Sequence, residues 1–377
     1  MKYLRSIARN SILIYKTLRN DVDRLYKSQY FPSKPHTINL LANDICNSRC
    51  KMCLIWKNKR DKEITPPELK KILSDILFSD IKHVGITGGE PTLRKDLPEL
   101  FRVVCESLPE LRGVSTITNA INKKQVVERV SDSSNVCKEF NKSFSLMVSL
   151  DGVGSVHDEQ RGRQGNFDSA IDVINYFQKN TDIPVLAGCT ITKKNVWNID
   201  ELFDYCQKES IKIRFRIADF INRLYNDQEI EIIRNFTPEE SYHLALFFEK
   251  LALTYEKSGS VKRTYRNIRK MLFEDSKRTI ACPYQYDAVM LDCRGYIQYC
   301  APKSKIIGNA LEQSAYKIWK GNLSERRRII REDCNNCIHD YHAQKTLPEL
   351  FTQIKNSRFK NLLSLKNGMS LYHRFFG

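Results

Sequence analysis

Hydrophobic and polar positions alternate along the chain in a pattern that predicts strands followed by helices. From residue 36 onward, short β-rich apolar runs are followed by stretches whose apolar residues recur every three or four positions. We expect strands at 36–42, 82–87, 113–118, 144–150, 185–192 and 212–217, and helices at 66–78, 97–107, 167–179 and 199–209. Parallel strands joined by helical crossovers predict an α/β partial barrel with its chemistry at the carboxyl ends of the strands.

The same patterns divide the chain into five segments. Residues 1–35 predict a basic amphipathic helix, which either packs on the body of the protein or lies on an anionic membrane. Residues 36–220 form the predicted barrel and 221–281 a helical bridge, in which Thr237-Pro238-Glu239-Glu240 has the pattern of an N-cap with a capping box. Residues 282–345 predict a small cysteine-rich domain, and 346–377 a basic tail.

Charge and cysteine content narrow the function. The 61 Lys and Arg residues exceed the 44 Asp and Glu residues, and the net charge of +17 favours an anionic partner. No apolar run reaches the length of a signal peptide core or a membrane span, so we expect a cytoplasmic protein. The 12 cysteines should then stay reduced, and clustered ones become candidate ligands of a metal or cofactor.

Three cysteines follow the first predicted strand, in the segment Cys46-Asn47-Ser48-Arg49-Cys50-Lys51-Met52-Cys53. Three thiolates can hold a four-iron, four-sulfur (4Fe-4S) cluster and leave one iron without a protein ligand. A structural zinc site normally takes a fourth cysteine or histidine nearby, so the CxxxCxxC spacing argues against zinc.

This motif resembles that of the radical SAM superfamily, and the resemblance continues along the predicted barrel. After the second strand, Gly88-Gly89-Glu90-Pro91 resembles the family segment that holds the amino group of S-adenosylmethionine (SAM). Glycines allow close backbone approach, and a carboxylate suits an ammonium group. The resemblance implies that SAM chelates the open iron, and that the reduced cluster splits SAM to a 5′-deoxyadenosyl radical, which abstracts a hydrogen atom from carbon.

Further matches fall at the later strand ends, where the resemblance implies contacts with SAM. They are Asn119, Ser149, Asp151 and Thr190, together with Arg161 in the stretch His157-Asp158-Glu159-Gln160-Arg161-Gly162. Met52 stands where the family often has an aromatic residue, and a polarisable methionine can also cover an adenine ring.

Four later cysteines form a second set, Cys282, Cys300, Cys334 and Cys337. With Gly295 in a GxxxxC pattern before Cys300, they resemble the auxiliary-cluster domain called twitch, a shorter relative of SPASM. The resemblance implies one auxiliary 4Fe-4S cluster whose irons are all ligated by protein, with a zinc ribbon as the alternative. Cys293 could replace a ligand, whereas the cysteines at 105, 137, 189 and 206 fit buried apolar positions.

The sequence says less about the substrate than about the chemistry, because proteins of one fold act on many different substrates. About 35 residues precede the barrel, too few for a winged-helix peptide-recognition domain, and the basic charge suits phosphate or membrane-surface substrates. We therefore expect oxidation or epimerisation of a small anionic or lipid-linked carbohydrate-type metabolite. Ala301 stands where related dehydrogenases carry an acidic base, which leaves Asp287, Asp292 and Arg216 as candidates.

Three other functions remain open from the sequence. The protein could mature a ribosomally made peptide by crosslinking, epimerisation or thioether formation, modify RNA, or be a non-enzymatic iron–sulfur scaffold. The basic residues are spread along the chain and no RNA-binding module is recognisable, which argues against nucleic acid. The expected partners are a small-molecule or peptide substrate and a low-potential flavodoxin-like or ferredoxin-like electron donor, with contact to an anionic membrane as a further expectation.

Overall fold

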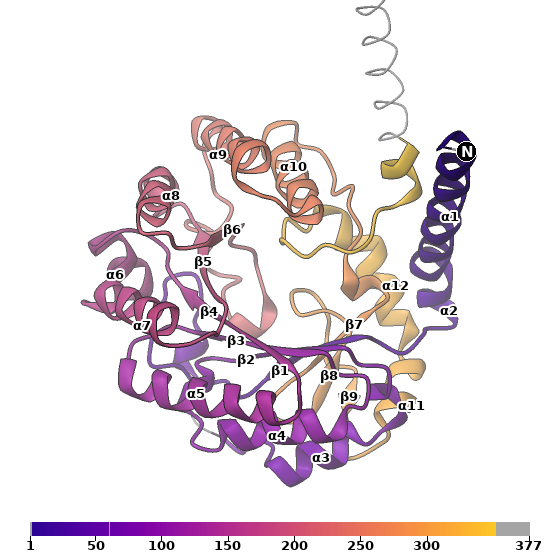
Figure 1. The fold of residues 1–377 in the computed structure, drawn as a ribbon, viewed down its shortest axis with the longest axis horizontal. Helices are drawn as coiled ribbons and strands as arrows, with labels where there is room; N and C mark the ends of the chain where they lie inside the picture. The colour runs from indigo at the N-terminus through magenta and orange to yellow at the C-terminus, as the bar shows by residue number, and fades with distance from the viewer. Residues whose placement is uncertain (1, 60, 352–377) are drawn as a thin grey trace, which may run out of the picture.

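The computed structural model describes residues 2–59 and 61–351, and side chains from residue 12 onward. Six parallel strands, each hydrogen-bonded to the next, form the curved sheet at the centre of Figure 1. They are β1 (Thr37–Leu41), β2 (His83–Thr87), β3 (Gly113–Thr118), β4 (Ser143–Ser149), β5 (Val185–Ile191) and β6 (Ile213–Ile217). This sheet confirms the α/β partial-barrel class predicted from the sequence.

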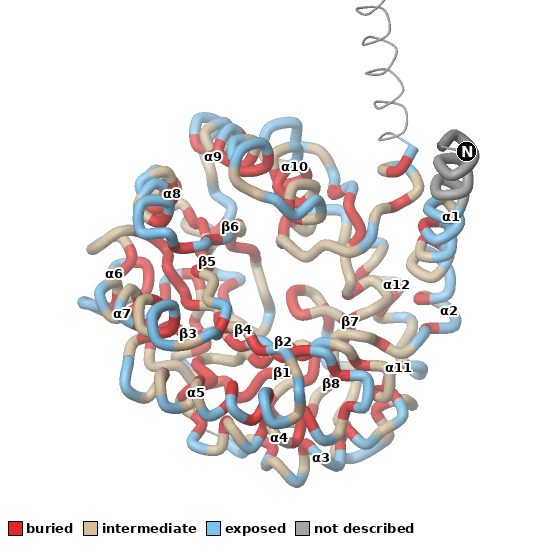
Figure 2. Tube along the Cα trace, viewed as in Figure 1, coloured by how far each residue is buried: buried red, intermediate tan, exposed pale blue. Residues whose placement is uncertain are grey.

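Helices cover the convex face of this sheet (Figure 1). They are α3 (Pro66–Leu73), α4 (Leu97–Ser107), α5 (Lys123–Glu139), α6 (Ser155–Arg161), α7 (Asn166–Asn180) and α8 (Ile199–Lys208). Buried positions follow the strands and the inner sides of these helices, whereas the exposed positions face outward (Figure 2). The apolar layer between strands and helices leaves the carboxyl ends of the strands free to carry polar side chains.

The sequence pattern missed the helix α5. Its sequence, KKQVVERVSDSSNVCKE, contains several Ser, Asn and Asp residues, which have weak helix propensity. The helix begins at an Asn122 cap, whose side chain accepts a hydrogen bond from the Gln125 amide at 3.2 Å. Val126, Val130 and Cys137 are buried, so tertiary packing supplies the stability that local propensity lacks.

The cysteine-rich region extends the barrel sheet instead of forming a sheet of its own. The strand β7 (Ala288–Leu291) pairs in parallel with β1, and the antiparallel strands β8 (Tyr296–Gln298) and β9 (Gly308–Asn309) follow. The order of the nine strands is therefore β6-β5-β4-β3-β2-β1-β7-β8-β9. The helices α11 (Ala315–Gly321) and α12 (Leu323–Glu332) complete this region beside the barrel (Figure 1).

Two helices bridge the barrel and the cysteine-rich region, α9 (Pro238–Lys250) and α10 (Gly259–Phe273), separated by a π-helical turn at Leu251–Tyr255. The Thr237 hydroxyl accepts from the Glu240 amide, and the Glu240 carboxylate accepts from the Thr237 amide, which confirms the predicted capping box. The helix starts at this cap, earlier than residue 242 where its apolar periodicity begins.

The first helix, α1 (Lys2–Val22), stands at one edge of the molecule and leads through a π-helical turn at Asp23–Lys27 into α2 (Ser28–Tyr30) (Figure 1). Of the apolar residues at helical spacing, Leu18, Val22 and Leu25 are exposed, so the expectation that this face packs on the body is wrong for them. Contact to an anionic membrane stays a prediction. Among the described helices, none combines the length and apolar character that a membrane crossing requires. Residues 352–377 of the predicted basic tail lie outside the described residues.

Candidate active site

A cavity with an empty volume of about 1160 Å³, including its open mouth, lies at the carboxyl ends of the barrel strands. Many of the residues singled out in the sequence line it, namely Cys46, Cys50, Met52, Cys53, Gly88, Gly89, Glu90, Asn119, Ser149, Arg161, Thr190 and Arg216. We call this space the barrel cavity.

The loop that carries the first three cysteines is held by α6. The Arg161 carbonyl accepts from the Arg49 amide at 2.9 Å and from the Ser48 hydroxyl at 2.9 Å. A Cβ added at Gly162 would lie 2.5 Å from the Arg49 carbonyl oxygen, so only glycine fits where α6 meets the loop. The stretch from His157 to Gly162 therefore positions the cysteine loop.

The two glycines after β2 serve the same loop from its other side. The Gly89 amide donates to the Asn43 carbonyl at 3.1 Å, and the Glu90 amide donates to the Ile45 carbonyl at 2.9 Å. A Cβ at Gly89 would lie 1.9 Å from the Ile45 carbonyl oxygen. The close approach predicted for these glycines thus occurs against the backbone that leads into Cys46.

Glu90 connects the ends of β2 and β3 beneath the cavity. The carboxylate is 1% exposed and accepts hydrogen bonds from the Thr118 hydroxyl at 2.9 Å and the Asn119 amide at 2.7 Å. Thr92 donates to it from both its amide and its hydroxyl. Burial raises the pKa of the Glu90 carboxyl, and these donors act in the opposite direction by favouring the charged form. No arginine or lysine pairs with Glu90 in the described part of the chain, so a cationic ligand group would find its charge available.

Asp151 lies behind the cavity wall and supports two residues that line it. Its Oδ2 lies 2.6 Å from the Arg161 Nε, and its Oδ1 accepts from the Thr190 amide at 2.7 Å. Arg161 in turn points a guanidinium nitrogen at the Cys50 sulfur, 3.7 Å away. Asp151 and Pro91 were predicted to contact the cofactor, but the structure does not place either among the residues that line the cavity.

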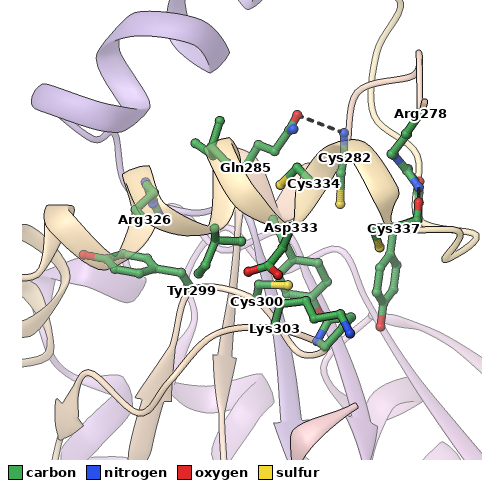
Figure 3. A pocket seen from close by; sticks show the side chains of 15 residues that line it. Arg278, Cys282, Gln285, Tyr299, Cys300, Lys303, Arg326, Asp333, Cys334 and Cys337 are labelled. Atoms are coloured by element: carbon green, nitrogen blue, oxygen red, sulfur yellow. Dashed lines mark hydrogen bonds between the residues drawn. The ribbon is translucent and has the colours of Figure 1, made fainter. Parts of the chain in front are cut away.

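The second set of cysteines surrounds a separate pocket beside the barrel. Cys282, Cys300, Cys334 and Cys337 all line this four-thiol pocket, which has an empty volume of about 490 Å³ (Figure 3). The Gln285 side chain accepts from the Cys282 amide at 3.3 Å, as the dashed line in Figure 3 shows. Cys293 is buried but does not line this pocket, and the four other cysteines at 105, 137, 189 and 206 belong to the barrel core.

The buried thiols of both sites would lose their protons more easily beside a positively charged group. Burial raises the pKa of Cys46 to about 12 and that of Cys53 to about 11, and it raises the pKa of Cys282 to about 12. Thiolates are therefore unfavourable there without a metal, whose charge deprotonates a coordinating thiol. Among the described residues, no three ligating side chains converge as the ligands of a single metal ion do. An iron–sulfur cluster differs because its thiolates bind separate irons.

Several cavity residues escaped the sequence reasoning. Asp219 follows β6, lines the barrel cavity, and has a buried Oδ2 with no donor among the described residues. Its position just after a strand is the signal that could have identified it. Of the proposed bases, Asp287 pairs with His36, Asp292 accepts from the Arg294 and Tyr296 amides, and neither lines the cavity.

Three residues of the cysteine-rich region also reach the barrel cavity, namely Ala301, His339 and Tyr341. Tyr341 lines both the barrel cavity and the four-thiol pocket, with its ring stacked on His339 at 3.9 Å between centroids. The two thiol sites are therefore neighbours that share Tyr341 as part of their walls. An α/β barrel with a three-thiol loop and an adjacent four-thiol pocket fits the iron–sulfur protein that the sequence predicts.

Comparison with known proteins agrees with this class. Residues 41–206 match the profile of the radical SAM superfamily. Fe-coproporphyrin III synthase of Methanosarcina barkeri is 30% identical over 168 residues, which cover 44% of this chain and 39% of that protein. The sporulation killing factor maturation protein SkfB of Bacillus subtilis is 27% identical over 309 residues, which cover 80% of this chain and 68% of that protein. The crystal structure of Streptococcus suis SuiB bound to precursor peptide SuiA shares the fold, with 18% identity, a TM-score of 0.57, and coverage of 82% of this chain and 71% of that one.

The matched residues 41–206 make up less than half of the chain, so the similarity to the radical SAM superfamily concerns the barrel. The chain spans about two fifths of the length of Fe-coproporphyrin III synthase, so its substrate is a separate question.

Proposed function

We propose that this enzyme matures a ribosomally made peptide by a two-electron oxidation at one of its carbon atoms. The observation that carries the proposal is that one cavity is lined by both the three-cysteine loop and residues of the cysteine-rich region. A substrate in this cavity would lie between the two thiol sites, and Ala301 beside Cys300 would contact it. That arrangement suits a reaction in which a hydrogen atom and an electron leave the same substrate.

Cys46, Cys50 and Cys53 would hold the cluster that binds SAM, and Cys282, Cys300, Cys334 and Cys337 the auxiliary cluster. Bound there, these cofactors supply hydrogen-atom abstraction and acceptance of one electron. The protein's own residues would orient these cofactors and balance their charges. Glu90 offers a buried negative charge, and Arg161 offers a buried positive charge beside Cys50. Met52 lines the same cavity and is apolar enough to cover an adenine.

The remaining polar groups of the cavity suit a peptide. The Arg223 Nε and Nη1 are buried without an acceptor among the described residues, and the Asp219 Oδ2 is buried without a donor. A peptide backbone or side chain offers both kinds of partner, and satisfying such groups favours binding because leaving them unpaired is costly. Asp219 is also placed to accept the proton that leaves an oxidised substrate.

Relatives support a peptide over the carbohydrate-type metabolite expected from the sequence. SkfB is named as a maturation protein for the sporulation killing factor, and SuiB was solved with a precursor peptide. The relatives that we found do not support a carbohydrate or lipid substrate. A flavodoxin-like or ferredoxin-like electron donor stays a prediction.

The test uses the full chain, reconstituted anaerobically and incubated with SAM, dithionite and short peptides encoded beside its gene. We expect 5′-deoxyadenosine from the wild type, transfer of deuterium into it from a labelled peptide, and a product that has lost two hydrogen atoms by mass spectrometry. Cys300→Ala should keep the first two signals and lose the oxidised product. Cys189→Ala, which changes a buried cysteine outside both sites, is the control.

Unchanged peptide oxidation in Cys300→Ala would contradict the role of the four-thiol pocket. Deuterium transfer from a sugar substrate, with none from any peptide, would contradict the peptide assignment. RNA retardation in gels that weakens steeply with salt, together with RNA-dependent SAM cleavage, would favour RNA modification instead.

A further inference from the structure

A buried arginine at the four-thiol pocket has no anionic partner among the described residues. Arg326 of α12 lines the pocket and is 1% exposed. Its Nη1 donates to the Ser28 carbonyl at 3.1 Å, whereas its Nε and Nη2 have no acceptor in the part of the chain that the structure describes. An isolated charge inside a protein is strongly unfavourable unless a group of opposite charge lies near it.

Aromatic rings hold this guanidinium in place without cancelling its charge. The Arg326 guanidinium carbon lies 4.2 Å from the ring centre of Tyr299 and 4.0 Å from that of Trp319. Burial lowers the pKa of Arg326 to about 10, which leaves the group protonated at neutral pH. In Figure 3, Arg326 and Tyr299 lie on one side of the pocket, and Cys282, Cys334 and Cys337 on the other.

The other charged groups that line the pocket have partners for their polar atoms, although the carbonyls that Arg278 and Lys303 contact cancel no charge. Arg278 donates to the carbonyls of Ile280, Cys337 and His339, and Lys303 donates to the Phe220 carbonyl at 2.8 Å. Asp333 forms an ion pair with Arg328 at 2.8 Å. Among the described lining residues, Arg326 is thus the cation whose nitrogens remain unpaired.

We propose that Arg326 is one of the counter-charges of the auxiliary cluster and raises its reduction potential. This inference rests on the proposed function, because it requires that the four thiols hold an iron–sulfur cluster. Four thiolates give such a cluster a net negative charge, and one added electron makes it more negative without moving a proton or breaking a bond. A fixed cation nearby therefore stabilises the reduced form more than the oxidised form.

The neighbouring residue Arg327 provides a matched control. It also lies on α12, and it donates to the Gln29 carbonyl at 2.9 Å, one residue from the carbonyl that Arg326 contacts. Its guanidinium lies 5.6 Å from the ring centre of Tyr30. Arg327 does not line the four-thiol pocket, so its loss removes the same charge and a similar α2 contact without touching the cluster site.

The experiment measures the midpoint potential of the auxiliary cluster in the full chain. A background with Cys46, Cys50 and Cys53 replaced by Ala leaves only the auxiliary cluster, which is titrated with redox dyes and followed by electron paramagnetic resonance. We compare the wild-type Arg326 with Arg326→Met, Arg326→Lys and Arg327→Met, after measuring iron, sulfide and zinc. At a fixed potential, Arg326→Met should shift the oxidised-to-reduced ratio at least tenfold toward the oxidised form, which is about 59 mV for one electron.

Arg326→Lys should recover most of that shift, and Arg327→Met should leave the potential unchanged. If Arg326→Met does not fold, Arg326→Gln replaces it, because glutamine also removes the charge; a tenfold or larger shift toward the oxidised form supports the charge role, and a smaller shift overturns it. Equal potentials in Arg326→Met and the wild type overturn the inference and leave the proposed function intact. Zinc in place of iron in the wild-type background overturns the cluster assignment itself.

Discussion

Replacing Glu90 by Gln tests the site most directly, because it removes one buried charge and keeps the shape of the side chain. The carboxylate accepts four hydrogen bonds, three at one oxygen and one, from the Asn119 amide, at the other. A glutamine fits best with its amide group toward the Asn119 amide, where two donors then face each other. An unsatisfied buried donor costs about 1–3 kcal/mol, which is the expected fall in the free energy of unfolding of the cofactor-free protein.

The larger effect should appear in SAM binding. A hydrogen bond to a charged group contributes about 1.5–3 kcal/mol, so the loss of the Glu90 charge should raise the Kd for SAM by roughly 10- to 150-fold. Equilibrium dialysis under nitrogen, at matched iron content, measures this Kd. Glu99→Gln makes the same chemical change at an exposed position on α4 and should leave both quantities unaltered.

A Kd for SAM within twofold of the wild type, in a folded and fully loaded Glu90→Gln protein, would refute our reasoning about this residue. Glu90 would then act only as a structural acceptor for the ends of β2 and β3. A lower stability with an unchanged Kd would identify that role.

Three further substitutions test other parts of the argument. Gly89→Ala places a Cβ 1.9 Å from the Ile45 carbonyl oxygen, so iron loading should collapse, whereas Gly259→Ala, with no atom within 4 Å, should be neutral or slightly stabilising. Burial lowers the pKa of His157 from 6.5 to about 4, so the unfolded chain binds a proton before the folded one does as the pH falls. The free energy of unfolding should therefore fall by up to about 3 kcal/mol between pH 6.5 and 4, and urea titrations of His157→Gln should lack that component. Replacing Cys46, Cys50 and Cys53 together by Ala should abolish 5′-deoxyadenosine formation and leave iron bound at the four-thiol pocket; total loss of iron would show that the second site does not load independently.

Local sequence signals located the barrel strands well, since alternating apolar runs report burial on a sheet directly. They failed at α5, whose Ser, Asn and Asp residues hide a buried face; at α1 they predicted the helix but did not decide whether its apolar residues pack on the body. They also failed to show that β7 joins β1, because strand pairing between residues 37–40 and 288–291 leaves no mark in either segment alone.

The motif residues could be recognised one by one, yet their roles depend on contacts. Gly88 and Gly89 were expected to let the backbone approach a ligand, and the structure shows them against Asn43 and Ile45. Asp151 was expected at the cofactor and instead supports Arg161 and Thr190 from behind.

The sequence by itself determined which groups this protein can use: two sets of cysteines, a glycine-glycine-glutamate segment, and the strand-and-helix alternation that places such groups at one edge of a sheet. Only the tertiary structure decided that the barrel cavity and the four-thiol pocket share Tyr341, and that Arg326 is buried without an anionic partner among the described residues. The physical reason is that composition and spacing act along the chain, whereas burial and charge pairing depend on residues that meet only after the chain has folded.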